Sequence, residues 1–196
     1  VGAYHARNLE HARNRRFKEA LADAERMIAL DSNYVEGILA EGQAHFDLQQ
    51  YEEAVKSFAR VMRKDTALYT MNYSIALSHL RANKHTDAVR YIRRYLRRDK
   101  KMKEAYELLG AAYFNKKQYD SAGTAFGDYI KLDGKAVTGW LNRASCYMQL
   151  GKAAPALADL DEALKRDPKN ANGQLNKALL LLRMNRKDEG CRILQQ

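Results

Sequence analysis

Proline, cysteine and β-branched residues are all scarce in this chain of 196 residues. Proline occurs only 2 times, whereas a typical chain of this length contains about 10 prolines. Valine, isoleucine and threonine together number 17, too few for a large β-sheet, while alanine and leucine together number 52 and favour helices. An enzyme fold built around a sheet is therefore not expected.

Long apolar segments and clustered cysteines are also missing. The longest unbroken run of apolar side chains covers residues 178–182, far short of the ~20 residues that a membrane-spanning helix needs. Cys146 and Cys191 lie far apart without metal-type spacing, so neither a disulfide nor a zinc site is expected. The chain starts at Val1 without an initiating methionine or a leader segment. We expect a cytoplasmic protein, and a periplasmic or membrane-anchored form stays open because the N-terminal segment is missing.

The sequence does contain a repeat of 34 residues. Written in rows of 34 the chain aligns without insertions, and position 20 of successive rows reads Ala20, Ala54, Ala88, Ala122, Ala156 and Gly190. Each row holds two amphipathic segments separated by a short polar stretch, which predicts a pair of antiparallel helices. We therefore expect an all-α fold that forms one domain over residues 1–196. Its repeats would cover 1–34, 35–68, 69–102, 103–136 and 137–170, with a partial sixth at 171–196.

The residues at these positions resemble the tetratricopeptide repeat. Residues 103–136 match its pattern best, with Tyr106, Leu109, Gly110, Tyr113, Tyr119, Ala122 and Phe126. The next repeat adds Trp140, Tyr147, Gly151, Ala156, Ala163 and Pro168. The resemblance implies a right-handed superhelical solenoid of antiparallel helix pairs, in which stacked neighbours bury a continuous core. Gly42 and Gly110 lack bulk at one shared position, so we expect the two helices of a pair to approach closely there.

The resemblance also implies a concave groove, lined by the first helix of each pair, that holds a peptide or helix of another protein. The residues at the groove positions of the family are Gln43, Tyr73, Leu77, Glu107, Leu108, Ala111, Asn142, Ser145 and Asn176. Asn142 and Asn176 share one position and resemble the start of an asparagine ladder that binds a peptide backbone, the alternative being a solvated helix face. The carboxylate clamp of chaperone-binding members is absent from the sequence, so capture of an acidic chaperone tail is not expected.

The formal net charge of +10 is concentrated in one repeat, because residues 69–102 alone carry +7. Arg90, Arg93, Arg94 and Arg97 recur at i, i+3, i+4 and i+7, which makes one face of the second helix strongly basic. In the family this helix faces away from the groove. The face is either an ordinary solvated surface or a contact for an anionic partner, such as an acidic protein, RNA or a membrane surface. Tyr91 and Tyr95 are expected in the core rather than on a base-stacking surface.

No catalytic or cofactor-binding pattern accompanies the repeats. His11, His45 and His79 recur at the period, but equivalent residues of packed helices lie about 8–10 Å apart and cannot share one metal ion. They are expected to pack as aromatic residues do, while Asp159 and its acidic neighbours are expected on a solvated helix surface. We expect neither metal, cofactor nor small-molecule substrate, and hence a scaffold or adaptor rather than an enzyme.

Two alternatives to an independent scaffold stay open at this stage. The chain would also suit a regulatory segment of a larger enzyme or of a secretion or assembly complex. Both ends lack a polar capping helix, which solenoids normally need, so self-association through the uncapped ends is a further expectation.

Overall fold

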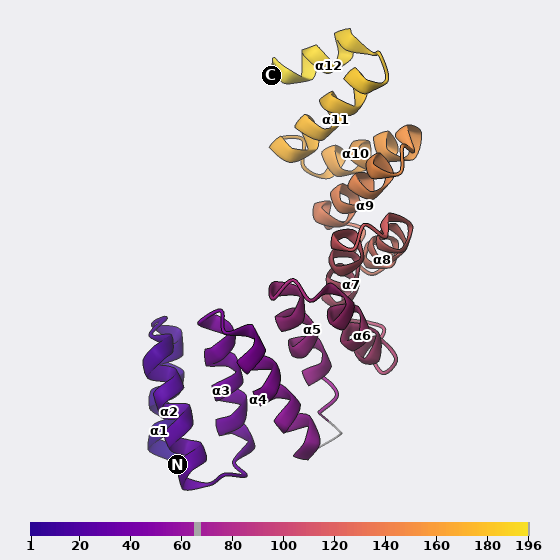
Figure 1. Cartoon of the computed structure of the whole chain (residues 1–196). Coiled ribbons are helices and arrows are strands. Elements are labelled where there is room, and N and C mark those ends of the chain that lie inside the picture. The colour runs from indigo at the N-terminus through magenta and orange to yellow at the C-terminus, as the bar shows by residue number, and fades with distance from the viewer. Residues whose placement is uncertain (65–67, 196) are drawn as a thin grey trace. The chain divides into compact units, whose positions relative to one another are not determined.

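The computed structural model describes residues 1–64 and 68–195, and all regular elements in these two ranges are α-helices (Figure 1). Residues 65–67, in the predicted second repeat, and Gln196, in the sixth, lie outside the described residues. The helices are α1 (Gly2–Arg13), α2 (Phe17–Leu30), α3 (Val35–Asp47), α4 (Tyr51–Lys64), α5 (Met71–Arg81), α6 (His85–Leu96), α7 (Lys103–Asn115), α8 (Tyr119–Leu132), α9 (Val137–Gln149), α10 (Ala153–Arg166), α11 (Ala171–Arg183) and α12 (Lys187–Leu194). No helix within the described ranges is long and apolar enough to cross a membrane.

The turn inside each helix pair has the same backbone geometry in all six repeats. The residue two positions before each second helix has φ between 56° and 70°, the left-handed region. The next amide N–H donates to a carbonyl five residues earlier, as from Gln118 to Tyr113 at 2.9 Å. This bond satisfies an orphan carbonyl of the first helix, as in the Schellman motif. The residues with positive φ are Arg15, Gln49, Asn83, Lys117, Gly151 and Asn185.

Small residues allow the helices of a pair to pack closely, as predicted. All five alanines at position 20 are buried. A Cβ atom at Gly42 would lie 2.7 Å from the ring of Phe58, and one at Gly110 would lie 2.6 Å from the ring of Phe126. Such distances are well inside van der Waals contact, so each aromatic ring takes the space that a larger residue would need.

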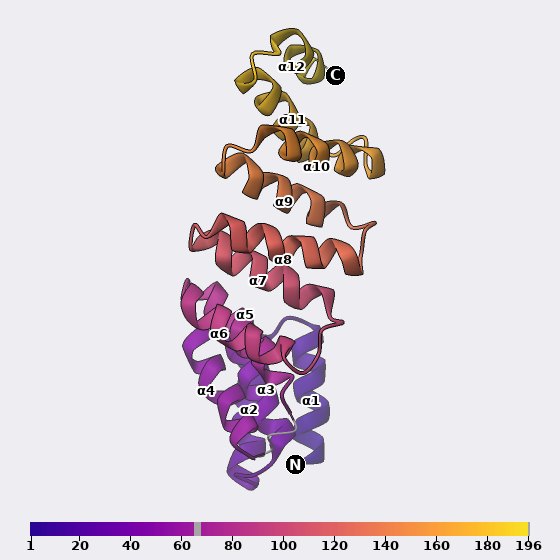
Figure 2. The ribbon, with the colours of Figure 1, turned by 90° about the vertical axis from the view of Figure 1, so that its right-hand side faces the viewer.

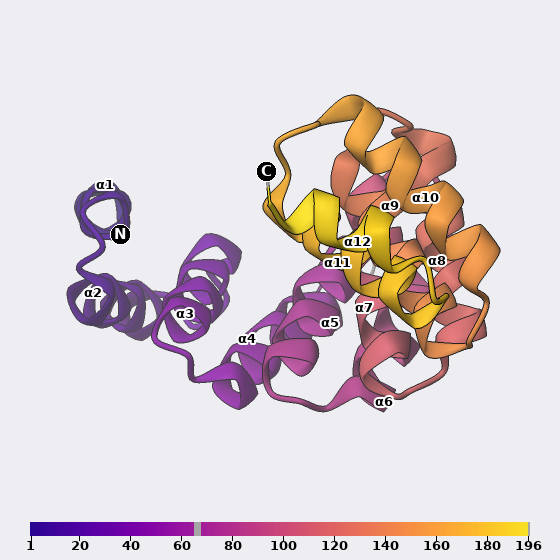
Figure 3. The same cartoon turned by 90° about the horizontal axis from the view of Figure 1, so that it is seen from above.

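The chain divides into two compact units, unit 1 over Val1–Arg98 and unit 2 over Asp99–Gln196. Within each unit, helices that follow one another in sequence pack against each other. Figure 2 shows the helices of unit 2 stacked in chain order. In unit 1 the first helices α1 and α3 lie on the same side of their partners α2 and α4 (Figure 3). A single continuous solenoid over both units stays a prediction.

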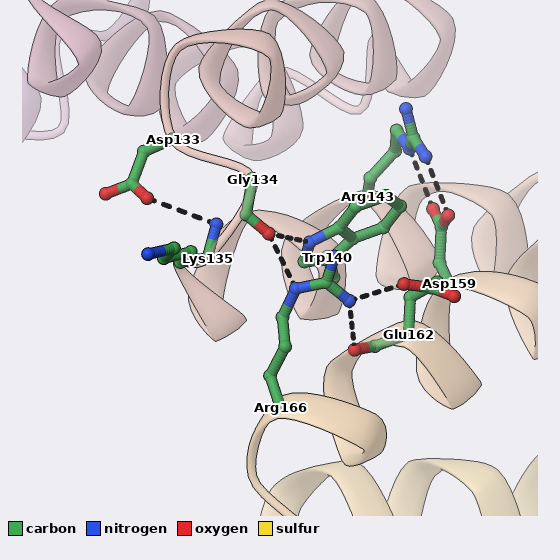
Figure 4. A network of polar contacts seen from close by, with 8 residues as sticks. All are labelled: Asp133, Gly134, Lys135, Trp140, Arg143, Asp159, Glu162 and Arg166. Atoms are coloured by element: carbon green, nitrogen blue, oxygen red, sulfur yellow. Dashed lines mark hydrogen bonds and ion pairs between the residues drawn. The ribbon is translucent and has the colours of Figure 1, made fainter.

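A polar network joins three successive segments of unit 2 (Figure 4). The indole N–H of Trp140 donates to the carbonyl of Gly134 at 3.0 Å, and Arg166 Nε donates to the same carbonyl at 2.6 Å. Arg143 binds the carboxylate of Asp159 through two hydrogen bonds of 2.7 and 2.8 Å. The prediction of a solvated Asp159 is therefore wrong, because its carboxylate faces α9 and is buried against Arg143.

Candidate functional site

A hollow of about 370 Å³ lies among the first helices of unit 1. We call it the unit 1 groove. Most of its walls come from α1, α3 and α5, while residues of α2 and α4 reach its base. Its lining residues are His5, Asn8, Leu9, Ala12, Phe17, Ala20, Glu36, Leu39, Ala40, Gln43, Ala44, Asp47, Phe58, Met71 and Ser74.

The unit 1 groove combines an apolar base with polar positions along α3. Phe58 and Ala44 at its base are buried, while Leu9 on its wall is 45% exposed. The Gln43 amide donates to the carboxylate of Asp47 at 3.0 Å, which leaves the amide oxygen of Gln43 as an acceptor. The arrangement can bury an apolar side chain and accept hydrogen bonds from a peptide beside it.

The structure places the predicted groove residues of unit 1 in different surroundings. Gln43 lines the groove, but Tyr73 and Leu77 are not among its lining residues. The Tyr73 ring instead meets Tyr95 of α6 edge to face, with ring centroids 6.0 Å apart. The α5 wall consists of Met71 and Ser74. The sequence analysis also missed α1, although the same family positions there hold His5 and Leu9.

A smaller hollow of about 210 Å³ lies between α7 and α9 in unit 2. It brings together three predicted residues, Ala111, Asn142 and Ser145, with Phe114, Asn115 and Phe126. The amides of Asn115 and Asn142 offer donors and acceptors beside two phenyl rings.

The other predicted residues of unit 2 lie outside this hollow. Leu108 is only 6% exposed, so it belongs to the core and presents almost no surface to a ligand. Glu107 on α7 and Asn176 on α11 are half-buried, and neither is among the lining residues. The asparagine ladder therefore stays a prediction for Asn176.

The predicted basic face of α6 consists of exposed arginines, but they do not all have the same surroundings. Arg90 forms an ion pair of 2.7 Å with Asp87. The guanidinium groups of Arg90 and Arg94 lie 5.1 and 5.2 Å from the ring centroid of Tyr91. The Tyr91 ring also stacks on the ring of His79, with ring centroids 5.4 Å apart. This confirms the packing role predicted for Tyr91 and His79.

The three periodic histidines contact groups of their own repeats. His11 lies 3.7 Å from the carboxylate of Asp23, and His45 Nδ1 lies 2.7 Å from the amide oxygen of Gln50. Asp23 also accepts hydrogen bonds from Arg7, and they hold the pKa of its carboxyl below the ordinary value. Within residues 1–64 and 68–195, no group of histidine, cysteine and carboxylate side chains is arranged to hold a metal ion.

Stability is expected to depend on pH through His79. Burial of the His79 ring, which stacks on Tyr91, is the main cause that lowers the pKa of His79 from its ordinary value of 6.5. The unfolded chain therefore binds this proton more readily, and the contribution of His79 to stability is lost as the pH falls below 6.5. We expect the free energy of unfolding, measured with urea, to decrease from about pH 7.5 to about pH 5.5. His79→Phe should make this decrease smaller, whereas an unchanged pH profile would contradict the assignment.

Family models and solved structures resemble this chain over different lengths. A model described as tetratricopeptide repeat matches residues 73–137, and a second of the same description matches residues 137–170. Together they span half of the chain. The curated protein DnaJ homolog subfamily C member 7, from Homo sapiens and Mus musculus, is 42% identical over 50 residues, which are 26% of this chain. The match spans 10% of the length of that relative.

Solved structures share the fold at low sequence identity. MamA from Desulfovibrio magneticus RS-1 has a TM-score of 0.81 at 18% identity, over 87% of this chain and 96% of its own. PilF of Pseudomonas aeruginosa has a TM-score of 0.77 at 14% identity, over 99% and 89%. YrrB, described as a TPR protein with an unusual peptide-binding site, has a TM-score of 0.74 at 19% identity, over 87% and 88%. These likenesses confirm the predicted solenoid fold of helix pairs.

Proposed function

The chain belongs to the tetratricopeptide repeat family, and we propose that it is a scaffold or adaptor that binds a segment of another protein in the unit 1 groove. The observation that carries this proposal is the apolar base of the groove, which is open between three first helices and edged by polar side chains. Proteins seldom leave such concave apolar surface exposed without a ligand to cover it. Binding, rather than catalysis, is the role that this surface serves.

The lining residues indicate what the bound segment contains. A volume of about 370 Å³ falls in the range of ligand pockets and suits an apolar anchor residue of a peptide or amphipathic helix. Glu36 lies in the first turn of α3 and Asp47 is its last residue, so the two carboxylates stand at opposite ends of this wall. We therefore expect a partner segment with apolar anchors that are flanked by lysine or arginine.

One comparison and one feature of this chain support a peptide as the ligand. YrrB, which shares the fold, is described as having a peptide-binding site, although the low identity carries no residue of that site to this chain. In unit 2, the hollow with Asn115 and Asn142 offers amide groups that suit a peptide backbone. Unit 2 would thus offer a peptide-binding surface of its own.

Filling the groove is expected to weaken peptide binding without unfolding the chain. The probe is a peptide selected from a random display library against the full chain. Ala40 is half-buried and lines the groove, so Ala40→Trp should weaken binding about tenfold or more by occupying the space of the anchor residue. The affinity is measured by fluorescence anisotropy, and circular dichroism verifies the fold.

Ala22→Trp is the matched control. Ala22 is exposed on α2 and is not among the groove residues, so the same substitution there should change the affinity less than about twofold. The proposal fails if both variants bind the selected peptide like the unchanged chain, or if both lose it equally.

A further inference from the structure

Unit 1 has another hollow, of about 310 Å³, which shares no residue with the unit 1 groove. Three arginines line it, Arg94 from α6 and Arg97 and Arg98 from the segment that follows this helix. Among the described residues, Met62, Tyr69 and Asn72 also line it. We call it the arginine hollow.

The three arginines of the hollow do not form ion pairs with carboxylates of the described residues. Asp87, the acidic residue of α6, pairs with Arg90. None of the ion pairs within residues 1–64 and 68–195 involves Arg94, Arg97 or Arg98. Like charges at i, i+3 and i+4 repel one another. The C-terminal end of a helix attracts cations, but this effect does not require three guanidinium groups to line one hollow.

A buried acceptor lies in the wall of the same hollow. Asn72 is 6% exposed, and its amide nitrogen donates to the Tyr69 carbonyl at 2.8 Å. Its Oδ1 is buried and has no hydrogen-bond partner among the described residues. Leaving such an atom unsatisfied is unfavourable, so we expect a donor to bind it. A ligand that suits the hollow would therefore carry an anionic group and an N–H donor, which are both features of an acidic peptide.

The aromatic residues nearby disfavour single-stranded RNA as the ligand. Sequence-tolerant binding of bases relies on exposed aromatic faces. The half-buried ring of Tyr69 packs against Tyr95, with ring centroids 5.6 Å apart, and Tyr95 itself is only 4% exposed. The Tyr91 ring lies against the guanidinium groups of Arg90 and Arg94. Guanidinium groups, in contrast, match the geometry of carboxylates through paired hydrogen bonds.

We propose that the arginine hollow is a second docking site, which binds a glutamate- or aspartate-rich segment of a partner protein. A carboxylate enters between Arg94, Arg97 and Arg98, and a backbone or side-chain N–H of the same segment donates to Asn72 Oδ1. Arg93 is also exposed on the predicted basic face, and Arg90 there is paired with Asp87. Arg93 extends the positive potential along α6 toward further acidic residues of the partner segment.

Binding of a labelled oligoglutamate peptide to the full chain tests this site. Fluorescence anisotropy at low ionic strength should show saturable binding of oligoglutamate and none of oligoglutamine of the same length. The triple variant Arg94→Gln/Arg97→Gln/Arg98→Gln should weaken binding about tenfold or more. The corresponding triple lysine variant should lose part of the affinity, because lysine keeps the charge but not the paired hydrogen bonds.

A second triple variant separates this site from the overall positive charge. Arg13, Arg26 and Arg183 are exposed on α1, α2 and α11, so changing all three to glutamine removes the same charge elsewhere. This control should keep the affinity within about threefold. Equal losses in the two glutamine variants would overturn the proposal, as would tighter binding of oligouridylate RNA than of oligoglutamate at equal length.

Discussion

Replacing Gly110 with leucine is expected to lower the free energy of unfolding by about 3 kcal/mol. The first side-chain atom alone would lie 2.6 Å from Cε1 and 2.7 Å from Cζ of Phe126. The Phe126 ring is buried, so it cannot move into solvent to make room. Leucine gains about 1 kcal/mol in helix propensity over glycine, which offsets only part of this overpacking. Urea unfolding, followed by circular dichroism, measures the difference.

The same substitution in a Phe126→Ala background serves as the control. Removing the ring leaves space beside position 110, so leucine there should cost much less than it does beside phenylalanine. The coupling between the two changes should be about 2 kcal/mol or more. If leucine costs the same in both backgrounds, close packing of Gly110 against Phe126 does not explain the small residue at this position.

Asp159→Ala is expected to lower the free energy of unfolding by about 2–3 kcal/mol. The carboxylate is almost completely buried and accepts two hydrogen bonds from Arg143, whose guanidinium also lies 5.1 Å from the Trp140 ring centroid. Removing it leaves a charged and partly buried guanidinium without its acceptor. Trp140, the only tryptophan of the chain, reports the transition by fluorescence.

Asp161→Ala is the matched control on the same helix. Asp161 pairs with Lys177 at 2.7 Å, but about half of its side chain is exposed. Such a surface pair contributes about 1 kcal/mol or less. The double variant Arg143→Met/Asp159→Leu should recover most of the stability, because an apolar pair leaves no charge unpaired. If Asp159→Ala and Asp161→Ala lower the free energy of unfolding equally, the buried pair does not contribute more to stability than the exposed pair.

The helix pairs were predictable because the repeat imposes the same packing at regular intervals. The buried alanines at position 20 and the glycines beside Phe58 and Phe126 have a direct physical role in the close approach of helices. The left-handed turns were harder to predict from the sequence. Gly151, Asn83 and Asn185 are residues that adopt positive φ readily, but Arg15 and Lys117 are not. There the geometry of the surrounding helix pair sets the conformation.

The ion pairs of two buried aspartates, Asp23 and Asp159, were missed although the sequence contained a signal for them. Arg7 and Arg143 stand at position 7, where the family pattern has leucine, and each binds an aspartate 16 residues later. A charged residue at a core position, together with an opposite charge at the facing position of the second helix, predicts such a pair. The sequence analysis considered Asp159 only as a surface residue and did not consider Asp23.

Groove residues could be predicted only in part because family positions fix the face of a helix but not the direction of each side chain. Gln43, Ala111, Asn142 and Ser145 do line hollows. Leu108, in contrast, turns into the core. Neighbouring side chains from other helices decide such orientations, and their packing is not apparent from one repeat.

The central claim is that the unit 1 groove binds an apolar anchor of a partner segment, and methyl NMR of the full chain tests it most directly. Titration with the selected peptide should shift the methyl signals of Leu9, Leu39, Ala40 and Met71, which line the groove. Ala22, exposed on α2, should keep its signal unchanged. Shifts confined to α2, α4 or α6, with the groove methyl signals unaffected, would contradict the account.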